Sequence, residues 1–416
     1  MDKNVFEANR KKLSDIMRDK SAAVVMAGAA PYKRGDEKYT FSPDRNFYYL
    51  TGIDTENHVL LMTKSSGKVS ETLYIERDNG FLAKWVGANI TPTEAEEISG
   101  ISSIKYIDEF LDDVAAFVFK NDVSEIYADT EKREWDSHPG AALAFCGEFL
   151  KRFPHVGVNN LYTIMAGLRV LKEPYELERI QKAIDITCRG FYKMMENAPK
   201  CRKEYEVEAY FDFELGLSGI RENAFKTIAA SGKNATILHY SKNNGDIKDG
   251  DLILVDAGAQ FEYYNGDLTR TFPANGRFTE LQKKIYNIVL DGQLKVIDAV
   301  KPGVRYAYLN ELITEHYFNE LKALGLLTEK KEVSRYFYHS IGHFLGAETH
   351  DPGSYGDCVL EEGMLLTVEP GLYIEEYGIG IRIEDNVLVT VDGAEVLSKG
   401  LIKTVEEIEE FMSGKG

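Results

Sequence analysis

The first 160 residues alternate between segments of helical periodicity and short apolar runs. Apolar positions three and four apart across residues 5–17 predict an opening helix. Residues 124–128 and four earlier runs, at 22–27, 48–51, 59–62 and 73–75, have the length and composition of strands. This alternation predicts an α/β domain. It ends in an irregular segment, residues 151–161, where Asn159 and Asn160 indicate a linker.

The second part of the chain has longer helical patterns. Leu177, Ile180, Ile184, Cys188 and Phe191 are spaced by threes and fours, so they predict the buried face of a long helix that starts near Pro174. Further helices are predicted over residues 204–217, 281–300 and 307–324, and strands over 252–255, 267–272, 365–369 and 379–389. The pattern indicates an α+β fold in which helices cover a mostly antiparallel sheet.

Length and charge narrow the class of protein. A chain of 416 residues is most simply two domains, which we place at residues 1–160 and 161–416. Its 49 basic and 67 acidic residues give a net charge of −18, which argues against nucleic acid as a partner. The same charge favours a cationic ligand, such as the amino terminus of a peptide.

Neither the cysteines nor the apolar segments indicate export or a membrane. The four cysteines show no paired metal spacing and no disulfide-scaffold density, which suits a reducing cytoplasm. No run approaches the ~20 apolar residues that span a bilayer. Residues 22–30 are apolar, but acidic residues precede them, so a buried strand is expected there rather than a secretion signal. The sequence therefore predicts a soluble, cytoplasmic protein.

Two aspartates lie in or beside predicted strands. Asp256 ends the apolar run 252–255, where an acid is costly unless it is paired or binds a metal. A turn near residues 261–263 would make Asp256 and Asp267 cross-strand neighbours. A turn at Asn265-Gly266, the stronger local signal, would leave Asp267 at the turn instead. The sequence leaves both registers open.

Further polar residues follow the later strands. Glu369 comes directly after the apolar run 365–368. Arg382 and Glu384 alternate with isoleucines and share one face of a strand, where they could simply pair with each other. His339 and His343 are four apart, which allows one helical face, although Gly342 between them makes a loop equally compatible.

Taken together, four carboxylates and one imidazole can hold two divalent ions when some carboxylates bridge. Such a pair activates water for hydrolysis, so the residues predict a metallohydrolase. Oxygen-rich ligation with a single imidazole suits Mn(II), with Co(II) or Zn(II) as alternatives. No Gly-x-Ser-x-Gly motif appears, and no cysteine lies beside a candidate base, so serine and cysteine hydrolases are not supported.

The motifs around these five residues resemble, in type, order and spacing, those of the pita-bread metallopeptidases, and specifically the two-domain aminopeptidase P and prolidase. Residues 45–52 and 172–177 also resemble segments of these enzymes. The resemblance covers essentially the whole chain. It implies a pita-bread catalytic domain with a smaller N-terminal domain, and the activity of an Xaa-Pro aminopeptidase. An Xaa-Pro dipeptidase (prolidase) and an inactive binding module on the same fold are the alternatives.

The resemblance also implies a role for each site residue. Asp256 resembles the ligand of one metal, Asp267 and Glu384 the carboxylates that bridge both, and His343 and Glu369 the ligands of the other. Glu369 could also move the proton between the water and the leaving nitrogen. The remaining roles concern the substrate: His239 and His350 resemble histidines that position it and stabilise the tetrahedral intermediate, and His339, Tyr373 and Arg382 resemble the wall of the pocket for proline. A homodimer or homotetramer is expected, and Trp85 loosely resembles an aromatic that reaches a neighbouring subunit.

Overall fold

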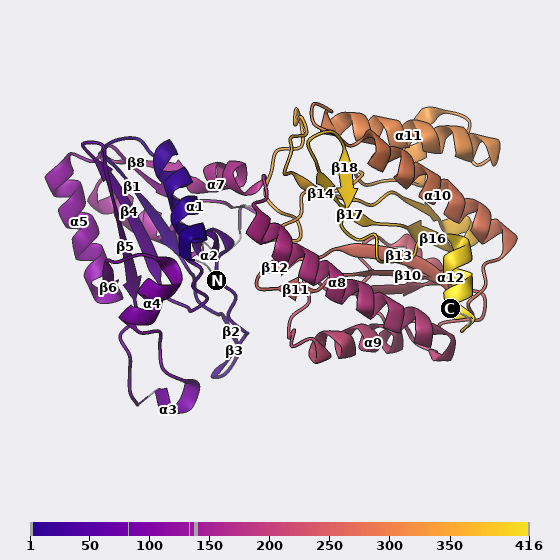
Figure 1. Cartoon of the computed structure of the whole chain (residues 1–416), viewed down its shortest axis with the longest axis horizontal. Coiled ribbons are helices and arrows are strands. Elements are labelled where there is room, and N and C mark those ends of the chain that lie inside the picture. The colour runs from indigo at the N-terminus through magenta and orange to yellow at the C-terminus, as the bar shows by residue number, and fades with distance from the viewer. Residues whose placement is uncertain (1–2, 82, 133, 137–139, 415–416) are drawn as a thin grey trace. The chain divides into compact units, whose positions relative to one another are not determined.

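The computed structural model describes residues 3–81, 83–132, 134–136 and 140–414 (Figure 1). The chain divides into two compact units, residues 1–168 and 169–416. The irregular run that suggested a linker near residue 160 instead contains the edge strand β8 (Gly157–Asn160), which pairs with β7 (Glu125–Ala128). Asn159 pairs with Tyr127 in this ladder, and its side-chain amide donates a hydrogen bond to Glu125 at 2.5 Å.

The first unit is built on a mixed six-stranded sheet with helices on both faces. Successive side chains of the central strand β1 (Ser21–Met26) point to opposite faces, so Val24 and Val25 enter two separate hydrophobic cores. Helices α5 (Phe110–Asn121) and α6 (Ala141–Arg152) cover the Val24 face. Helices α1 (Lys3–Ile16), α2 (Arg45–Thr51), α4 (Pro92–Ser99) and α7 (Leu161–Arg169) cover the other. The strand order is β6 (Ile104–Tyr106), β5 (Lys68–Ile75), β4 (Val59–Ser65), β1, β7, β8.

One predicted strand of this unit is a helix. Residues 48–51, whose apolar character suggested a strand, form the second half of α2. The Asp44 carboxylate accepts hydrogen bonds from the backbone N–H groups of Asn46 and Phe47 and so caps the helix start. Gly52, at φ +70°, provides the left-handed residue that ends it. The caps, rather than the apolar run between them, decide the secondary structure here.

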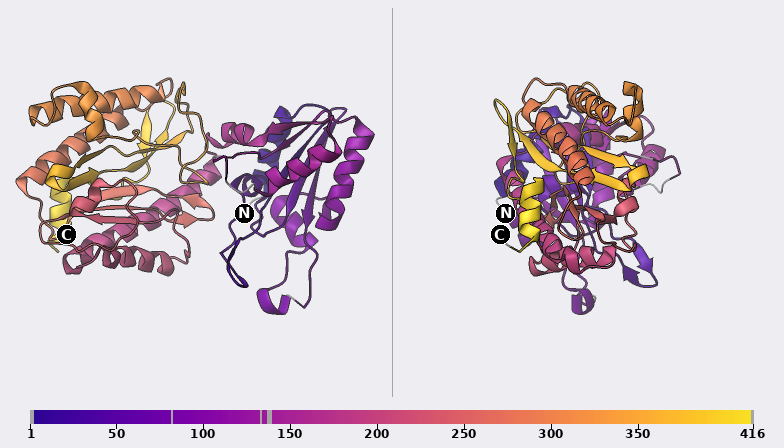
Figure 2. Two further views of the ribbon diagram at one scale, coloured as in Figure 1. Left: turned by 180° about the vertical axis from the view of Figure 1, so that it is seen from behind. Right: turned by 90° about the vertical axis from the view of Figure 1, so that its right-hand side faces the viewer.

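In the second unit, helices flank antiparallel strands on two sides (Figures 1 and 2). The long helix α8 (Pro174–Asn197) packs on α9 (Glu204–Leu217), and a Cβ on Gly190 would meet the Phe211 ring at 2.3 Å, so glycine permits their close approach. Helices α10 (Glu280–Ala299) and α11 (Tyr306–Ala323) lie on the opposite side, and α12 (Val405–Met412) is C-terminal. None of the described helices is long and apolar enough to cross a membrane.

The strands of this unit form two antiparallel three-stranded sheets and shorter ladders. One sheet has the order β13 (Leu268–Pro273), β10 (Leu252–Ala257), β9 (Ile228–Ser231). The other has the order β14 (Leu365–Val368), β17 (Asp385–Val389), β18 (Ala394–Val396). The predicted strand 379–389 is in fact two strands, β16 (Ile379–Arg382) and β17, because residues 383–384 leave the ladder. Strand β16 pairs with β15 (Gly371–Ile374) instead.

The hairpin between β10 and β13 takes the first of the two turns considered above. It is extended by β11 (Gln260–Phe261) and β12 (Tyr264–Asn265), and its tip is Glu262-Tyr263, both at positive φ. Gly266 serves packing rather than the turn, since a Cβ there would meet the backbone of α8 at 3.1 Å. Of the two turns that the sequence left open, the one at Asn265-Gly266 does not form.

Candidate metal centre

The candidate ligands lie where strands end. Asp256 is near the end of β10, and Asp267 immediately precedes β13. Asp256 pairs with Thr269. Asp267 lies two residues before Thr269, so its side chain is on the same face as that of Asp256. Glu369 follows β14, and Glu384 lies in the break between β16 and β17. The hairpin thus brings together the two aspartates that the sequence could not place.

The other two carboxylates meet across a similar break. Val368 pairs with Asp385, and Gly371 pairs with Arg382, in ladders of the same register. Glu369 and Glu384 therefore occupy opposite positions between the two ladders. Both residues lie outside the regular ladders; Glu384 is buried and Glu369 is partly exposed.

His343 joins the carboxylates from a loop. Its Nε2 lies 3.4 Å from Asp267 Oδ2 and 3.6 Å from Glu369 Oε1. One ligand atom each of Asp267, His343 and Glu384 lies within 4.8 Å of the others. Among the described residues, this is the group of three or more such side chains close enough to share a metal ion. The distances suit donors arranged around a cation.

Hydrogen bonds to residues outside the candidate ligand set orient the His343 ring. Its Nδ1 donates to the Phe344 carbonyl at 3.0 Å, which leaves Nε2 as the acceptor that a metal ligand needs. The backbone N–H of His343 donates to Thr367 Oγ1 at 3.0 Å, and the Thr367 N–H donates to the His343 carbonyl at 2.8 Å. The loop is therefore fixed to β14, and the histidine is a loop residue rather than part of a helical face.

The carboxylates carry more negative charge than the surrounding protein balances. Burial, followed by the charges of Asp256 and Glu369, raises the pKa of Asp267 well above its usual value. Burial and then Asp267 raise the pKa of Glu384 well above its usual value, and burial raises the pKa of Glu369 as well. Acids so close together repel one another unless a proton or a cation lies between them.

Asp256 provides a separate test of whether a metal fits. Its Oδ2 accepts a hydrogen bond from Arg382 at 2.5 Å, so Arg382 pairs with Asp256 and not with Glu384 as the sequence allowed. Asp256 Oδ1 is buried and has no hydrogen-bond partner among the described residues. A buried carboxylate oxygen without a partner is costly, and a cation would satisfy it. Four carboxylates and one imidazole fit a hard or borderline divalent ion.

A hydrogen-bonded chain of three side chains borders the carboxylates. Arg382 Nη1 donates to the Tyr373 hydroxyl at 2.9 Å, which lies 2.8 Å from His339 Nε2. His339 Nδ1 donates to the Ser340 carbonyl at 2.8 Å. Burial, and then the charge of Arg382, lower the pKa of His339 to about 3, so the ring is neutral and its Nε2 accepts the Tyr373 proton. The hydrogen bonds of these three side chains therefore all donate in one direction, from Arg382 to Tyr373 and from Tyr373 to His339.

The other two candidate histidines, His239 and His350, are exposed to solvent. The His350 ring lies 4.2 Å from the His343 ring, between centroids, at the edge of the carboxylate cluster. His239 is close enough to His339 to contribute to the low pKa of that ring. Buried acids with exposed imidazoles beside them form a site that a substrate can approach from solvent.

Sequence reasoning missed the threonines that support the ligands. Thr269 Oγ1 donates to Glu384 Oε2 at 2.7 Å and accepts from Arg382 Nε at 3.1 Å. Thr367 Oγ1 lies 3.4 Å from Glu369 Oε1. Each threonine lies in a strand, two positions from a candidate ligand just beyond the strand end: Thr269 from Asp267, and Thr367 from Glu369. That spacing is visible in the sequence and could have identified both.

Residues 178–391 match metallopeptidase family M24, and residues 6–127 match the aminopeptidase P N-terminal domain. The chain belongs to metallopeptidase family M24. This confirms the resemblance seen in the motifs and, with the structures below, the α+β pita-bread fold with its separate N-terminal domain.

Individual relatives agree over nearly the full length. The chain is 33% identical to the Xaa-Pro aminopeptidase of Haemophilus influenzae, over 99% of this chain and 97% of the relative. A solved Bacillus anthracis structure described as a candidate aminopeptidase P is 47% identical, with a TM-score of 0.96 and coverage of 100% and 99%. Aminopeptidase P of E. coli with the inhibitor Pro-Leu is 30% identical, with a TM-score of 0.91 and the same coverage.

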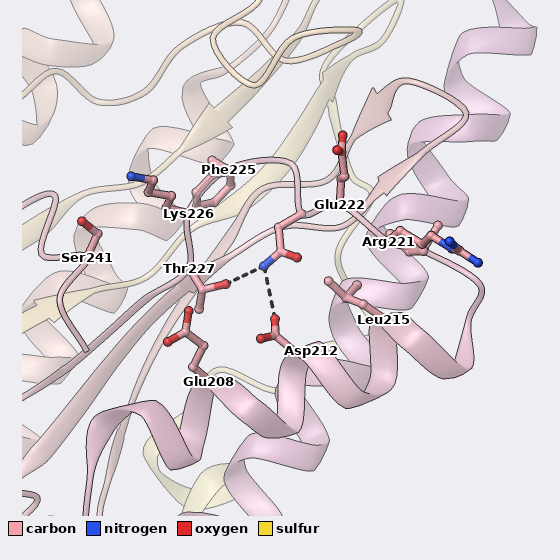
Figure 3. Close-up of a pocket in the computed structure, with 11 residues that line it drawn as sticks. Glu208, Asp212, Leu215, Arg221, Glu222, Phe225, Lys226, Thr227 and Ser241 are labelled. Atoms are coloured by element: carbon pink, nitrogen blue, oxygen red, sulfur yellow. Dashed lines mark hydrogen bonds between the residues drawn. The ribbon is translucent and has the colours of Figure 1, made fainter. Parts of the chain in front are cut away.

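A groove lies apart from this centre. It has a volume of about 760 Å³ and runs beside α9, where Glu208 and Asp212 point toward Thr227 (Figure 3). Asn223 donates to Thr227 at 3.0 Å and to Asp212 at 3.4 Å. The lining of the groove includes both acidic and basic side chains. It includes none of the five candidate ligands.

Proposed function

We propose that this M24 metallopeptidase is an Xaa-Pro aminopeptidase that releases the N-terminal residue next to a penultimate proline. The observation that carries the proposal is the cluster of buried carboxylates and His343 beside the neutral His339, Tyr373 and Arg382. The full-length similarity to named Xaa-Pro aminopeptidases supports it. So does the E. coli structure with Pro-Leu, an inhibitor that begins with proline.

The proposed cofactor is a pair of divalent ions, most simply Mn(II), with Co(II) or Zn(II) as alternatives. Asp256 would bind one ion, Asp267 and Glu384 would bind both, and His343 and Glu369 would bind the other. Such ions supply a polarised carbonyl and an activated water near neutral pH. A zinc-substituted form of the E. coli relative has been solved, which supports tolerance of more than one metal in the family.

Glu369 is the proposed proton carrier. It is partly exposed, it lies beside His343, and burial raises its pKa, which makes its carboxylate a stronger base toward a water proton. It would accept the proton of the attacking water and deliver it to the leaving nitrogen. In an Xaa-Pro bond that nitrogen is a tertiary amide without N–H, so protonation is needed as the proline departs.

The other residues would handle the substrate. His350 would donate a hydrogen bond to the carbonyl oxygen as negative charge develops on it, and His239 would position the peptide. His339, Tyr373 and Arg382 would form the wall against the proline ring, with Tyr373 held by hydrogen bonds on both sides. The substrate's free amine would bind among the acids, which accounts for cleavage at the end of a chain.

We also propose a domain division, an assembly and a location. The family matches at 6–127 and 178–391 lie on either side of the proposed boundary between residues 1–160 and 161–416. The division between the two compact units, after residue 168, lies eight residues later, because α7 packs in the first unit. A homodimer or homotetramer is proposed because Phe81, Trp85 and Val86, at or beside α3 (Ala83–Val86), are 69%, 76% and 84% exposed. The cysteine content favours the cytoplasm.

Two other functions make different predictions. A prolidase would use the same residues but cleave only Xaa-Pro dipeptides. A binding module on this fold would hold no metal, which elemental analysis would reveal.

The test is to incubate the Mn(II)-loaded protein with Xaa-Pro and with Xaa-Pro-Yaa-Zaa and to measure release of the first residue. Asp267→Ala, purified in the same way, controls for contaminating peptidases. We expect cleavage of the longer peptide and none by the control. Cleavage of the dipeptide alone would show a prolidase, and cleavage of neither would refute the proposed function.

A further inference from the structure

A buried ion network lies directly after His350. Asp351 is 2% exposed, and its carboxylate accepts a hydrogen bond from Arg169 Nη2 at 2.6 Å and from Lys172 Nζ at 2.8 Å. Arg169 and Lys172 are 1% and 6% exposed. Asp351 therefore holds two cations inside the protein, one residue away from a solvent-exposed histidine.

The network is attached to the loop that carries His350. Asp351 Oδ1 also accepts from the backbone N–H of Glu348 at 3.0 Å, and the Asp351 N–H donates to the Phe344 carbonyl at 2.9 Å. A Cβ on Gly346 would meet Asp351 Oδ2 at 2.6 Å, so the loop backbone packs directly against the carboxylate. The carboxylate thus closes the loop that runs between His343 and His350.

The cations belong to the segment that leads into α8. Lys172 Nζ also donates to the Arg169 carbonyl at 2.5 Å, and Arg169 Nη2 lies 3.2 Å from Glu348 Oε1. These bonds tie the two cations to each other and to the loop residue Glu348. The side chains of the anchor include none of the five candidate metal ligands, although the Phe344 carbonyl accepts from both the Asp351 N–H and His343 Nδ1.

His350 itself has little regular structure to hold it. It lies in a loop outside every described helix and strand, and the preceding residue, Thr349, reaches Ala224 with a hydrogen bond of 3.2 Å. A buried ion network adds little net stability, because desolvation offsets most of the attraction. What it supplies is fixed geometry, and a displacement of about 1 Å can cost a reaction about a hundredfold.

We propose that Asp351 is a positioning residue, whose buried ion pairs with Arg169 and Lys172 hold the His350 imidazole over the metal centre. The inference rests on the proposed function, in which His350 acts on the substrate carbonyl. Asp351 touches neither the substrate nor the metal in this account. Its effect on the reaction passes through His350.

A double-mutant cycle with His350→Ala tests this directly. In the wild-type background, we expect Asp351→Asn to lower kcat about 10- to 100-fold, with KM within about threefold and bound Mn(II) unchanged. In the His350→Ala background, the same change should cost less than about twofold, because there is no imidazole left to position. Lys172→Met should give a smaller, equally non-additive loss, and Lys172→Arg should retain kcat.

Glu71→Gln is the matched control. It removes the carboxylate partner of another buried arginine, Arg10, at 2.7 Å in the first unit. It should lower the thermal midpoint without lowering kcat. If Asp351→Asn does not fold, the same double-mutant cycle with His350→Ala is run with Lys172→Met, and the inference is judged on whether the losses of kcat are non-additive.

Equal losses of kcat in both backgrounds, no loss in either, or a fall in metal content would overturn the inference. A wild-type protein that fails to cleave Xaa-Pro peptides would instead refute the proposed function. The two failures are therefore distinguishable.

Discussion

Glu384 and Asp385 are neighbours in sequence, and both are buried, but their surroundings are opposite. Asp385 accepts hydrogen bonds from Arg270 at 2.8 Å, Lys403 at 2.7 Å and Ser398 at 2.7 Å. Although burial alone would raise its pKa, Arg270 and Lys403 lower the pKa of Asp385 to about 2. For Glu384, burial and Asp267 both act to raise the pKa.

The difference separates a structural charge from a functional one. Around Asp385 the protein supplies the cations itself. Around Glu384 it gathers further acids and leaves part of the charge unbalanced. The protein neutralises Asp385 with its own cations but not Glu384. A cation from solution would balance the charge around Glu384. We therefore regard unbalanced burial, rather than burial alone, as the mark of the metal centre.

Removing a bridging ligand should have the largest effect. We expect Asp267→Ala to reduce kcat about a thousandfold or more, because metal sites contribute several kcal/mol to catalysis. Bound metal should fall with it, while the far-UV circular dichroism and the midpoint of the metal-free protein should not. Wild-type metal content and activity in this variant would refute the bridging role.

Asp385→Asn should have the reverse profile. It leaves Arg270 and Lys403 without their shared carboxylate, so we expect the free energy of unfolding to fall by about 3–5 kcal/mol. Because the pKa of Asp385 is lowered on folding, its contribution is full above the unfolded value near 4 and is lost as the pH falls toward about 2. Urea unfolding at pH 3 and pH 7 measures both effects, and an equal loss at the two pH values would contradict the ion-pair account.

The metal-free centre should respond to pH in the opposite direction. Folding raises the pKa of Asp267, Glu369 and Glu384, so their contribution is most favourable below the unfolded value near 4 and is lost as the pH rises. After removal of metal with EDTA, Glu384→Gln should therefore gain stability relative to wild type between pH 5 and pH 8. We expect about 1 kcal/mol or more, the free energy of one pKa unit. A constant difference across this range would count against unbalanced charge.

Tyr373→Phe should have the smallest effect. It removes the hydroxyl that accepts from Arg382 and donates to His339, while the ring remains. We expect kcat/KM for an Xaa-Pro peptide to fall about tenfold, equivalent to about 1.4 kcal/mol, with metal content unchanged. A loss of metal would mean that Tyr373 supports the ligands rather than the proline pocket.

Asp256 and Glu369 could be singled out from the sequence because each acid directly follows an apolar run, where it requires an explanation. The full set of candidate ligands, with Asp267, Glu384 and His343, came from the resemblance of the motifs. In the second unit, helix α9 begins and ends where its periodicity predicts. Helical periodicity and apolar runs are visible in the sequence because they depend on residues that are close together along the chain.

What the sequence could not give depends on distant packing. The hairpin turns at Glu262-Tyr263, two residues that ordinarily avoid positive φ, and Gly266 packs against the backbone of α8. Arg270 lies 115 positions from Asp385, so the sequence around Asp385 does not reveal that its charge is neutralised. Helix α2 shows the same limit at short range, where Asp44 and Gly52 outweigh an apolar run.

Calorimetric titration of the metal-free protein with Mn(II) tests the central claim most directly. The account predicts two ions per chain for the wild type, and at most one, or at least tenfold weaker binding (about 1.4 kcal/mol), for Glu384→Gln. Two ions bound to Glu384→Gln with wild-type affinity would contradict it.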